Sequence, residues 1–155
     1  MRKHITPSWF YKSFEELTIA QLYNILKLRN EVFVVEQDCA YQDCDNKDPQ
    51  SLHLWGVLDQ DIVAYARIVP PGGSYPEASI GRVATNRAYR RLSFGRELMK
   101  RAIDATLEQY GPVNIRISAQ SYLQQFYEGF GFMKVSEEYL EDDIPHIEML
   151  WDHTK

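Results

Sequence analysis

The sequence predicts an α/β (α+β) fold with a mixed, mostly antiparallel sheet of about six to seven strands. Short segments of alternating apolar and polar residues, separated by turn residues, indicate the strands. Two longer segments repeat apolar residues at helical spacing. A strand, a helix and a strand follow one another in residues 78–117, which implies one parallel pair with a right-handed crossover. A chain of 155 residues can bury a continuous core, so we expect residues 1–155 to form one domain.

The first half of the chain is expected to combine one helix with an antiparallel meander. Thr18 begins the helix, with Gln21 three residues later as in a capping box, and the helix ends near Asn30. Residues 31–37 fit either a second helical piece or a strand, and the polar residues 38–50 are expected to be a surface loop. The expected strands are residues 9–11, 52–58, 62–69 and 78–85, with a hairpin turn at residues 59–61.

The second half contains the clearest helix, residues 94–110, in which apolar side chains recur on one face before Gly111 and Pro112 end it. A short helix is expected at residues 122–128, stopped by the glycines that follow it. The expected strands of this half are residues 113–117, 132–139 and 145–151.

Composition and charge exclude several classes of function. A net charge of -5 disfavours a nucleic-acid binder, because phosphate neutralisation needs a basic surface. No apolar run reaches the roughly 18 residues of a membrane span, and residues 1–7 contain no apolar signal core. We therefore expect a cytoplasmic protein without a membrane or nucleic-acid partner, in which Cys39 and Cys44 stay reduced. The spacing of these cysteines has no second matching pair, although Asp43 and His53 are close in sequence, so no metal is expected.

The segment between residues 87 and 101 is basic within this acidic chain. It holds six Arg or Lys residues and only one acidic residue, Glu97. Backbone N–H groups at the start of the predicted helix, together with the helix dipole, form a pocket for phosphate oxygens. Gly95 lets the backbone approach such a ligand closely. An anion site and a plain basic surface loop both fit this segment alone.

Three motifs resemble the GCN5-related N-acetyltransferase (GNAT) family. Residues 90–95 (RRLSFG) resemble its pyrophosphate loop Q/R-x-x-G-x-G/A, with Ser93 at the first glycine position. Residues 80–85 (IGRVAT) resemble its fourth strand, and residues 126–132 (FYEGFGF) its later F/L-Y-x-x-x-G-F motif. The ElaA-type branch is the most similar, through residues 32–37 (VFVVEQ), 41–43 (YQD) and 144–147 (IPHI).

The resemblance implies the GNAT fold, with helices on both faces of the sheet. Its parallel strands, here residues 78–85 and 113–117, splay apart and admit the pantetheine arm of acetyl-CoA. It also implies direct acetyl transfer to a bound amine, with acetyl-CoA as co-substrate and no metal. The residues expected to bind the cofactor are Val83, Ala84, Thr85, Arg90, Arg91, Ser93, Phe94, Gly95, Arg96, Gln120 and Tyr127.

Such a transfer needs an acid, a base and a donor to the oxyanion. Tyr127 is the expected acid, because a phenol with a pKa of about 10 is protonated at neutral pH and can donate to a thiolate. The backbone N–H of Ala84 or a neighbour would hold the oxyanion. His146 and Glu36 compete as the base, with His53 or an ordered water as the remaining choices.

The leading function hypothesis is an acetyl-CoA-dependent N-acetyltransferase that acts on a primary amine of a small molecule, or less readily of a peptide or protein. The alternative is a catalytically silent acyl-CoA-binding or sensing module. The acidic residues between positions 137 and 143 would attract a cationic amine if they border the acceptor pocket. The sequence leaves open whether the chain forms a homodimer.

Overall fold

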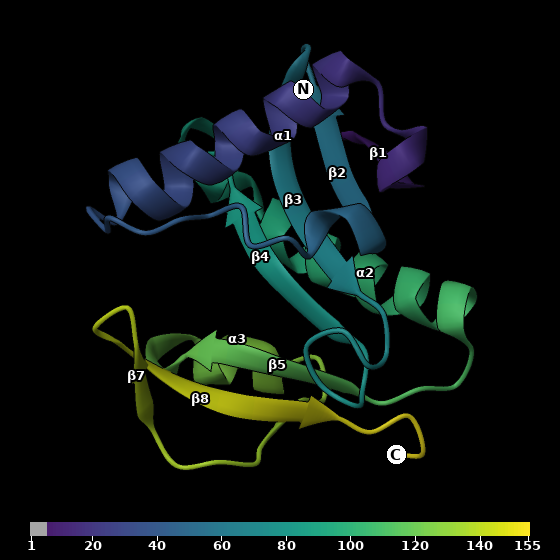
Figure 1. The fold of residues 1–155 in the computed structure, drawn as a ribbon, viewed down its shortest axis with the longest axis vertical. Coiled ribbons are helices and arrows are strands. Elements are labelled where there is room, and N and C mark those ends of the chain that lie inside the picture. Colours follow the sequence, from purple (N-terminus) through teal and green to yellow (C-terminus); the bar gives the residue numbers. More distant parts are fainter. Residues whose placement is uncertain (1–5) are drawn as a thin grey trace, which may run out of the picture.

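The computed structural model describes residues 6–155 as two four-stranded sheets that diverge from a shared edge (Figure 1). The first sheet has the antiparallel order β1-β2-β3-β4, which confirms the predicted meander. The second has the order β5-β8-β6, with β7 also paired to β8. The first sheet contains β1 (Ser8–Ser13), β2 (Leu52–Leu58), β3 (Asp61–Val69) and β4 (Ser79–Thr85). The second contains β5 (Ile115–Gln120), β6 (Met133–Lys134), β7 (Tyr139–Glu141) and β8 (Ile144–Trp151).

Helices cover both faces of the first sheet, as the resemblance predicts (Figure 1). The helices are α1 (Ile19–Arg29), α2 (Phe94–Tyr110) and α3 (Gln124–Glu128). The alternation along β3 explains this arrangement, because successive side chains point to opposite faces. Ala64 and Ala66 pack in the core cluster that contains the apolar face of α2, whereas Tyr65 packs with Ile25 and Leu28 of α1.

The two long helices begin as the sequence predicts. At α1, Thr18 Oγ1 accepts a hydrogen bond from the Gln21 N–H at 3.1 Å, and Gln21 Oε1 accepts one from the Thr18 N–H at 3.0 Å, which completes the capping box. Helix α2 spans the predicted residues 94–110. The ambiguous residues after α1 are helical, because Asn30–Glu36 continues α1 as a π-helix that buries Val32.

Three expectations for the second half need correction. Residues 132–139 are not one strand, because only Met133–Lys134 and Tyr139–Glu141 pair with β8. Between them the Ser136 hydroxyl, not a backbone carbonyl, accepts from the Glu148 N–H at 2.8 Å, which interrupts the ladder. The strand expected at residues 113–117 lies at Ile115–Gln120, and a 3₁₀ helix, Ser121–Leu123, precedes the short α3.

The hairpin turn that the sequence left undefined is a two-residue turn. Asp59 and Gln60 have φ values of 50° and 70°, and this left-handed pair matches a type I′ turn between β2 and β3. Asp142 and Asp143 repeat the geometry between β7 and β8, with φ values of 50° and 62°. The second turn holds Glu141 and Asp142 at the end of a tight hairpin.

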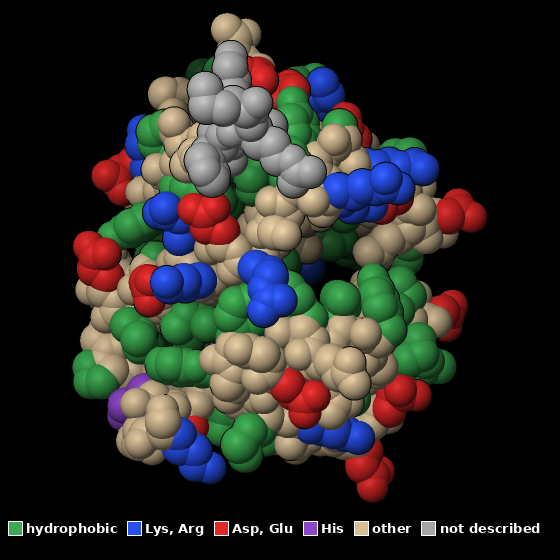
Figure 2. Space-filling view, turned by 180° about the vertical axis from the view of Figure 1, so that it is seen from behind, with side chains coloured by type: hydrophobic (Ala, Val, Ile, Leu, Met, Phe, Trp, Pro, Cys, Tyr) green, Lys and Arg blue, Asp and Glu red, His purple; other side chains and the backbone are tan. Residues whose placement is uncertain are grey.

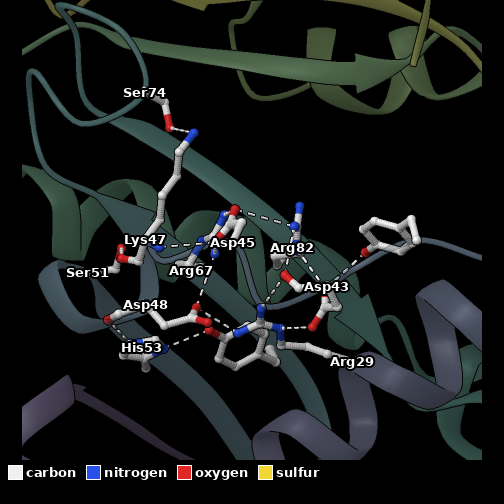
Figure 3. Close-up of polar contacts among 12 residues, drawn as sticks. Arg29, Asp43, Asp45, Lys47, Asp48, Ser51, His53, Arg67, Ser74 and Arg82 are labelled. Carbon is white, nitrogen blue, oxygen red and sulfur yellow. Dashed lines mark hydrogen bonds and ion pairs between the residues drawn. The ribbon is translucent and has the colours of Figure 1, made fainter. Parts of the chain in front are cut away.

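The segment 38–50 is more than the surface loop that its polarity predicts, because its aspartates enter a buried ion network (Figure 3). Arg29, at the end of α1, is fully buried and donates to Asp48 at 2.7 Å and to Asp43 at 2.8 Å. Arg67 of β3 binds Asp45 at 2.7 Å and Asp48 at 3.1 Å. The sequence predicts the polarity of the segment but not the arginines that it meets.

Arg82 of β4 completes the network by binding Asp43 at 2.8 Å and Asp45 at 3.4 Å. Three arginines therefore meet three aspartates, and the charges of the network balance. Burial alone would raise the pKa of Asp48, but hydrogen bonds from Arg29 and Arg67 hold it below its ordinary value. The network fixes the segment against α1, β3 and β4.

We expect Asp48→Asn to lower the free energy of unfolding by about 3 kcal/mol, because it leaves the buried charges of Arg29 and Arg67 undercompensated. Urea denaturation measures the change. Glu97→Gln is the matched control, since it removes one carboxylate from a partly exposed pair with Arg101 and should cost under about 1 kcal/mol. Equal losses in the two variants would show that the network does not stabilise the fold beyond an ordinary surface pair.

Candidate active site

A cavity of about 570 Å³ lies where β4 and β5 separate. The two strands share one parallel bridge, Ala78 to Ile115, at which the Arg116 N–H donates to the Ala78 carbonyl at 2.9 Å. Beyond the bridge each strand pairs only with its own sheet, which confirms the predicted splay. Figure 2 shows the resulting notch between the two halves of the molecule, with Lys and Arg side chains along one side.

Strand β4 carries a bulge where it faces the cavity. Tyr65 is opposite Ala84 but Arg67 is opposite Gly81, so Arg82 and Val83 together face one residue of β3, and Arg82 has a φ of 49°. The Asn86 N–H donates to the Val63 carbonyl of β3 at 2.8 Å.

Backbone groups alternate along a strand, so the direction of the Asn86 bond fixes that of its neighbours. From this alternation we expect the Ala84 N–H to point to β3 as well, and the backbone groups of Val83 and Thr85 to point to the open side. The Thr85 carbonyl accordingly accepts a hydrogen bond from Arg90 at 3.1 Å. Val83 and Thr85 line the cavity, and Ala84 packs in the core cluster of α1.

The predicted anion loop forms the next wall. A 3₁₀ helix, Arg87–Leu92, leads to Ser93, whose φ of 63° is left-handed, and α2 starts at the next residue. This conformation favours glycine, which explains why the GNAT loop carries one at this position. Ser93 makes no side-chain cap, and the first turn of α2 opens into the cavity at Ser93, Gly95 and Arg96.

The arginines of this loop have different roles. Arg90 forms a bidentate ion pair with Glu36 and also contacts the Thr85 hydroxyl at 3.3 Å, so its guanidinium already has partners. Arg96 is exposed and lines the cavity. Arg91 is exposed outside the cavity lining, and Phe94 is buried in the core under the loop. Of these four predicted cofactor-binding residues, Arg90 and Arg96 therefore line the cavity, and Arg91 and Phe94 do not.

Tyr127 lies on α3 and faces the same cavity from the opposite wall. Its side chain packs edge-on against Phe126 and Phe132, and only 7% of the residue is exposed. Burial raises the pKa of Tyr127 to about 12. The phenol is therefore fully protonated at neutral pH. Gln120, at the end of β5, lines the cavity beside α3.

The three candidate bases occupy different surroundings. His146 lines the cavity from β8, with Nδ1 2.7 Å from the Ile144 carbonyl and Nε2 3.2 Å from Glu141. Glu36 also lines it, but hydrogen bonds from Arg90 lower its pKa. His53 is fully buried between the Tyr65 hydroxyl and the Asp48 carbonyl, outside the cavity lining, and burial lowers its pKa. The geometry therefore excludes direct base catalysis by His53.

Sequence reasoning missed part of the wall. Cys39 and Tyr41 of the segment 38–50 line the cavity, and so does Tyr122 next to α3. Of the acidic run at residues 137–143, Glu141 and Asp142 reach the cavity. Glu141 and Asp142 lie close to His146 in the sequence, and this proximity could have indicated that they belong to the site. No local pattern indicates that Cys39 or Tyr41 does.

A comparison with protein families matches residues 18–153 to the acetyltransferase (GNAT) domain. The chain belongs to the GNAT family. A UPF0039 protein of Synechocystis is 43% identical over 145 residues, which cover 93% of this chain and 94% of that protein. These matches confirm the family that the sequence motifs predicted.

Two solved structures are similar over nearly the whole chain. An acyl-CoA N-acyltransferase from Pseudomonas aeruginosa has a TM-score of 0.91 and 40% identity over 94% of this chain and 99% of its own. Escherichia coli ElaA has a TM-score of 0.89 and 38% identity over 95% of this chain and 100% of its own. The similarity to the ElaA-type branch is thereby confirmed. The chain is an acyltransferase of the GNAT type with an acyl-CoA co-substrate.

Three further observations concern residues 6–155. None of their helices is long and apolar enough to cross a membrane. Within the same residues, no three or more His, Cys, Asp or Glu side chains are grouped to hold a metal ion. Cys39 and Cys44 are both free thiols.

We expect Gly95→Ala to weaken acyl-CoA binding about tenfold without lowering stability. A Cβ at this position would meet only Thr85 Cγ2, at 3.6 Å, so the protein itself has room for it. Alanine also favours a helix over glycine by about 0.5–1 kcal/mol. The added methyl would instead occupy the space through which a phosphate approaches the backbone of α2.

Calorimetric titration with coenzyme A and urea denaturation measure the two effects. Asp104→Ala, on an exposed position of the same helix outside the cavity lining, is the control and should leave affinity unchanged. An unchanged affinity in Gly95→Ala would exclude close approach of the cofactor to this turn.

Proposed function

We propose that this acyltransferase moves an acetyl group from acetyl-CoA directly to a primary amine of a small molecule. The observation that carries the proposal is that one cavity joins the N-terminus of α2, the open edge of β4 and the Tyr127 phenol. A phosphate-binding end, a strand edge and a proton donor are the three features that a thioester cofactor needs for transfer to an amine. We propose acetyl and not a longer acyl group because the matching family is described as an acetyltransferase domain.

The cofactor would lie along β4, with its pyrophosphate at the first turn of α2. The backbone N–H groups around Ser93 and Gly95 would bind phosphate oxygens, assisted by Arg96. Arg90 would contribute mainly by holding the loop, because Glu36 and Thr85 already occupy its guanidinium. Backbone groups of Val83 and Thr85, on the open side of β4, would bind the pantetheine arm and the oxyanion in place of Ala84. Gln120 would face the cofactor from β5.

Tyr127 would protonate the departing thiolate. Its raised pKa keeps the proton on the phenol at neutral pH, and its buried position beside the cavity excludes most water from the transfer. In this scheme the acceptor amine attacks the thioester directly, and no protein nucleophile is needed. Cys39 lines the cavity but would have no covalent role.

His146 is the better of the two remaining bases. Glu36 is a weak base, because its ion pair with Arg90 stabilises the carboxylate. The Nδ1–H of His146 can donate to the Ile144 carbonyl, which orients the ring and leaves Nε2 to accept a proton in the neutral form. His146 would take a proton from the substrate ammonium before attack.

The acceptor is proposed to be a small amine without a neighbouring carboxylate. Glu141 and Asp142 at the β7–β8 turn are acidic groups of the cavity, whereas Arg82 is bound by Asp43 and Asp45. An ammonium group would be attracted there, and an amino-acid carboxylate would be repelled.

We expect small primary amines to support release of coenzyme A thiol, and α-amino acids of similar size to react at least tenfold more slowly. A thiol-detection assay with a panel of acceptors and with acetyl-CoA and longer acyl-CoA thioesters measures this. Binding of acetyl-CoA is confirmed first by calorimetry. Tight cofactor binding with no release for any acceptor, peptides included, would favour a silent binding module instead.

Tyr127→Phe should lower kcat by about 100-fold and leave the affinity for acetyl-CoA nearly unchanged, because it removes only the proton donor. Single-turnover thiol release under conditions in which chemistry is limiting gives the rate. Tyr122→Phe, which alters an exposed tyrosine of the same wall, is the comparison variant and should retain most activity. A Tyr127→Phe rate equal to that of the wild type would remove Tyr127 from the acid role.

A further inference from the structure

We propose that Glu141 is a positioning residue for His146 and carries the proton of the reaction from the cavity to solvent. The inference rests on the proposed amine acetylation and on His146 as its base. It adds to that scheme a carboxylate that neither the family motifs nor the sequence pattern singles out for catalysis.

The stoichiometry of the transfer requires a proton outlet. An ammonium and acetyl-CoA give an amide, a free thiol and one proton, as the C–N bond forms and the C–S bond breaks. The attacking nitrogen loses two protons in all. One ends on the thiolate through Tyr127, and the other must leave through the base. That base, His146, is 7% exposed and has little contact of its own with solvent.

Glu141 connects His146 to solvent. Its Oε2 lies 3.2 Å from His146 Nε2, and its side chain is 54% exposed while that of His146 is 9% exposed. Both residues line the cavity. One end of the pair therefore reaches the substrate, and the other end reaches water.

The two contacts of the imidazole suit its protonated form. Nδ1 faces the Ile144 carbonyl at 2.7 Å, which accepts only, and Nε2 faces the Glu141 carboxylate. Both nitrogens donate at once only in the imidazolium form. In the neutral ring the Nε2 lone pair faces the Glu141 carboxylate, so an ammonium bound by that carboxylate would give its proton to Nε2. Glu141 would then hydrogen-bond the imidazolium and pass the proton on to solvent.

Most of the other charged groups around His146 are already paired. Tyr139 is the register partner of His146 on β7, and the two rings stack at 6.2 Å. Gln120, the partner on β5, is neutral. The other titratable groups on these strands or in the cavity are Glu148, paired with Arg116; Glu36, paired with Arg90; Arg82, paired with Asp43 and Asp45; and Arg96, Asp142, Cys39, Tyr41, Tyr122 and Tyr127.

The β7–β8 hairpin holds the carboxylate in place. Glu141 pairs with Ile144 across the turn formed by Asp142 and Asp143, and Tyr139 is anchored by a hydrogen bond between its hydroxyl and Ser118 of β5. The carboxylate is therefore positioned by a paired strand end and not by a loose loop.

The matched variants are Glu141→Gln and Asp143→Asn. Each removes one negative charge from the same hairpin, but Asp143 does not line the cavity, and asparagine tolerates its left-handed backbone. In Glu141→Gln the titration midpoint of the His146 ring, followed by NMR and assigned with His146→Gln, should fall by about half a pH unit. The acid limb of kcat/KM for the amine should move by the same amount, and the plateau rate should fall at least about threefold. Asp143→Asn should change neither.

An unchanged ring titration in Glu141→Gln, or an equal shift in Asp143→Asn, would overturn the pairing. A shifted titration with an unmoved acid limb and plateau would overturn the relay alone and leave the proposed acetylation intact. The double variant Glu141→Gln/His146→Gln should be no slower than His146→Gln, and additive losses would contradict action through His146. If the wild type acetylates no amine, the proposed function fails together with the relay, and the ring titration separately decides the pairing.

Discussion

The single parallel bridge between Ala78 and Ile115 is the constraint on which the site depends. At this bridge the two sheets share backbone hydrogen bonding, and beyond it β4 and β5 each keep an unpaired edge. Unpaired backbone groups in a protein interior are costly unless a ligand or water satisfies them. The split sheet therefore creates both a cavity and a set of donors and acceptors that a pantetheine arm could use. The bulge at Arg82 and Val83 bends the strand where it faces that cavity.

The buried ion network holds another wall of the same cavity, the one formed by segment 38–50. Segment 38–50 has little regular structure, and its position follows from Asp43, Asp45 and Asp48 meeting Arg29, Arg67 and Arg82. Because Arg82 lies at the bulge of β4, one set of contacts joins the wall that carries Cys39 and Tyr41 to the strand that faces the cofactor. The electrostatic cost of burying these charges is balanced only while the partners stay together, so the fold and the shape of this cavity wall are coupled.

The two ends of the cavity differ in charge, which suits the two substrates. The end at α2 has a helix N-terminus and Arg96, and the end at the β7–β8 turn has Glu141 and Asp142. An anionic cofactor and a cationic amine would therefore enter from opposite sides and meet near Tyr127. Two ion pairs near the cavity neutralise other charges: Arg90 with Glu36, and Arg82 with Asp43. The difference in charge between the two ends of the cavity is therefore preserved.

The sequence by itself determined the elements whose signals are local: the capping box at Thr18, helix α2, the meander of β2 to β4 and the three family motifs. It also indicated that residues 90–95, Tyr127 and His146 belong to a site. Only the tertiary structure decided that Arg90 is occupied by Glu36, that the aspartates of segment 38–50 are buried, and that Glu141 meets His146. Each of these facts depends on which side chain comes opposite another across a long sequence separation. Local periodicity carries no record of such pairings, because burial and partner choice arise only when the two sheets pack together.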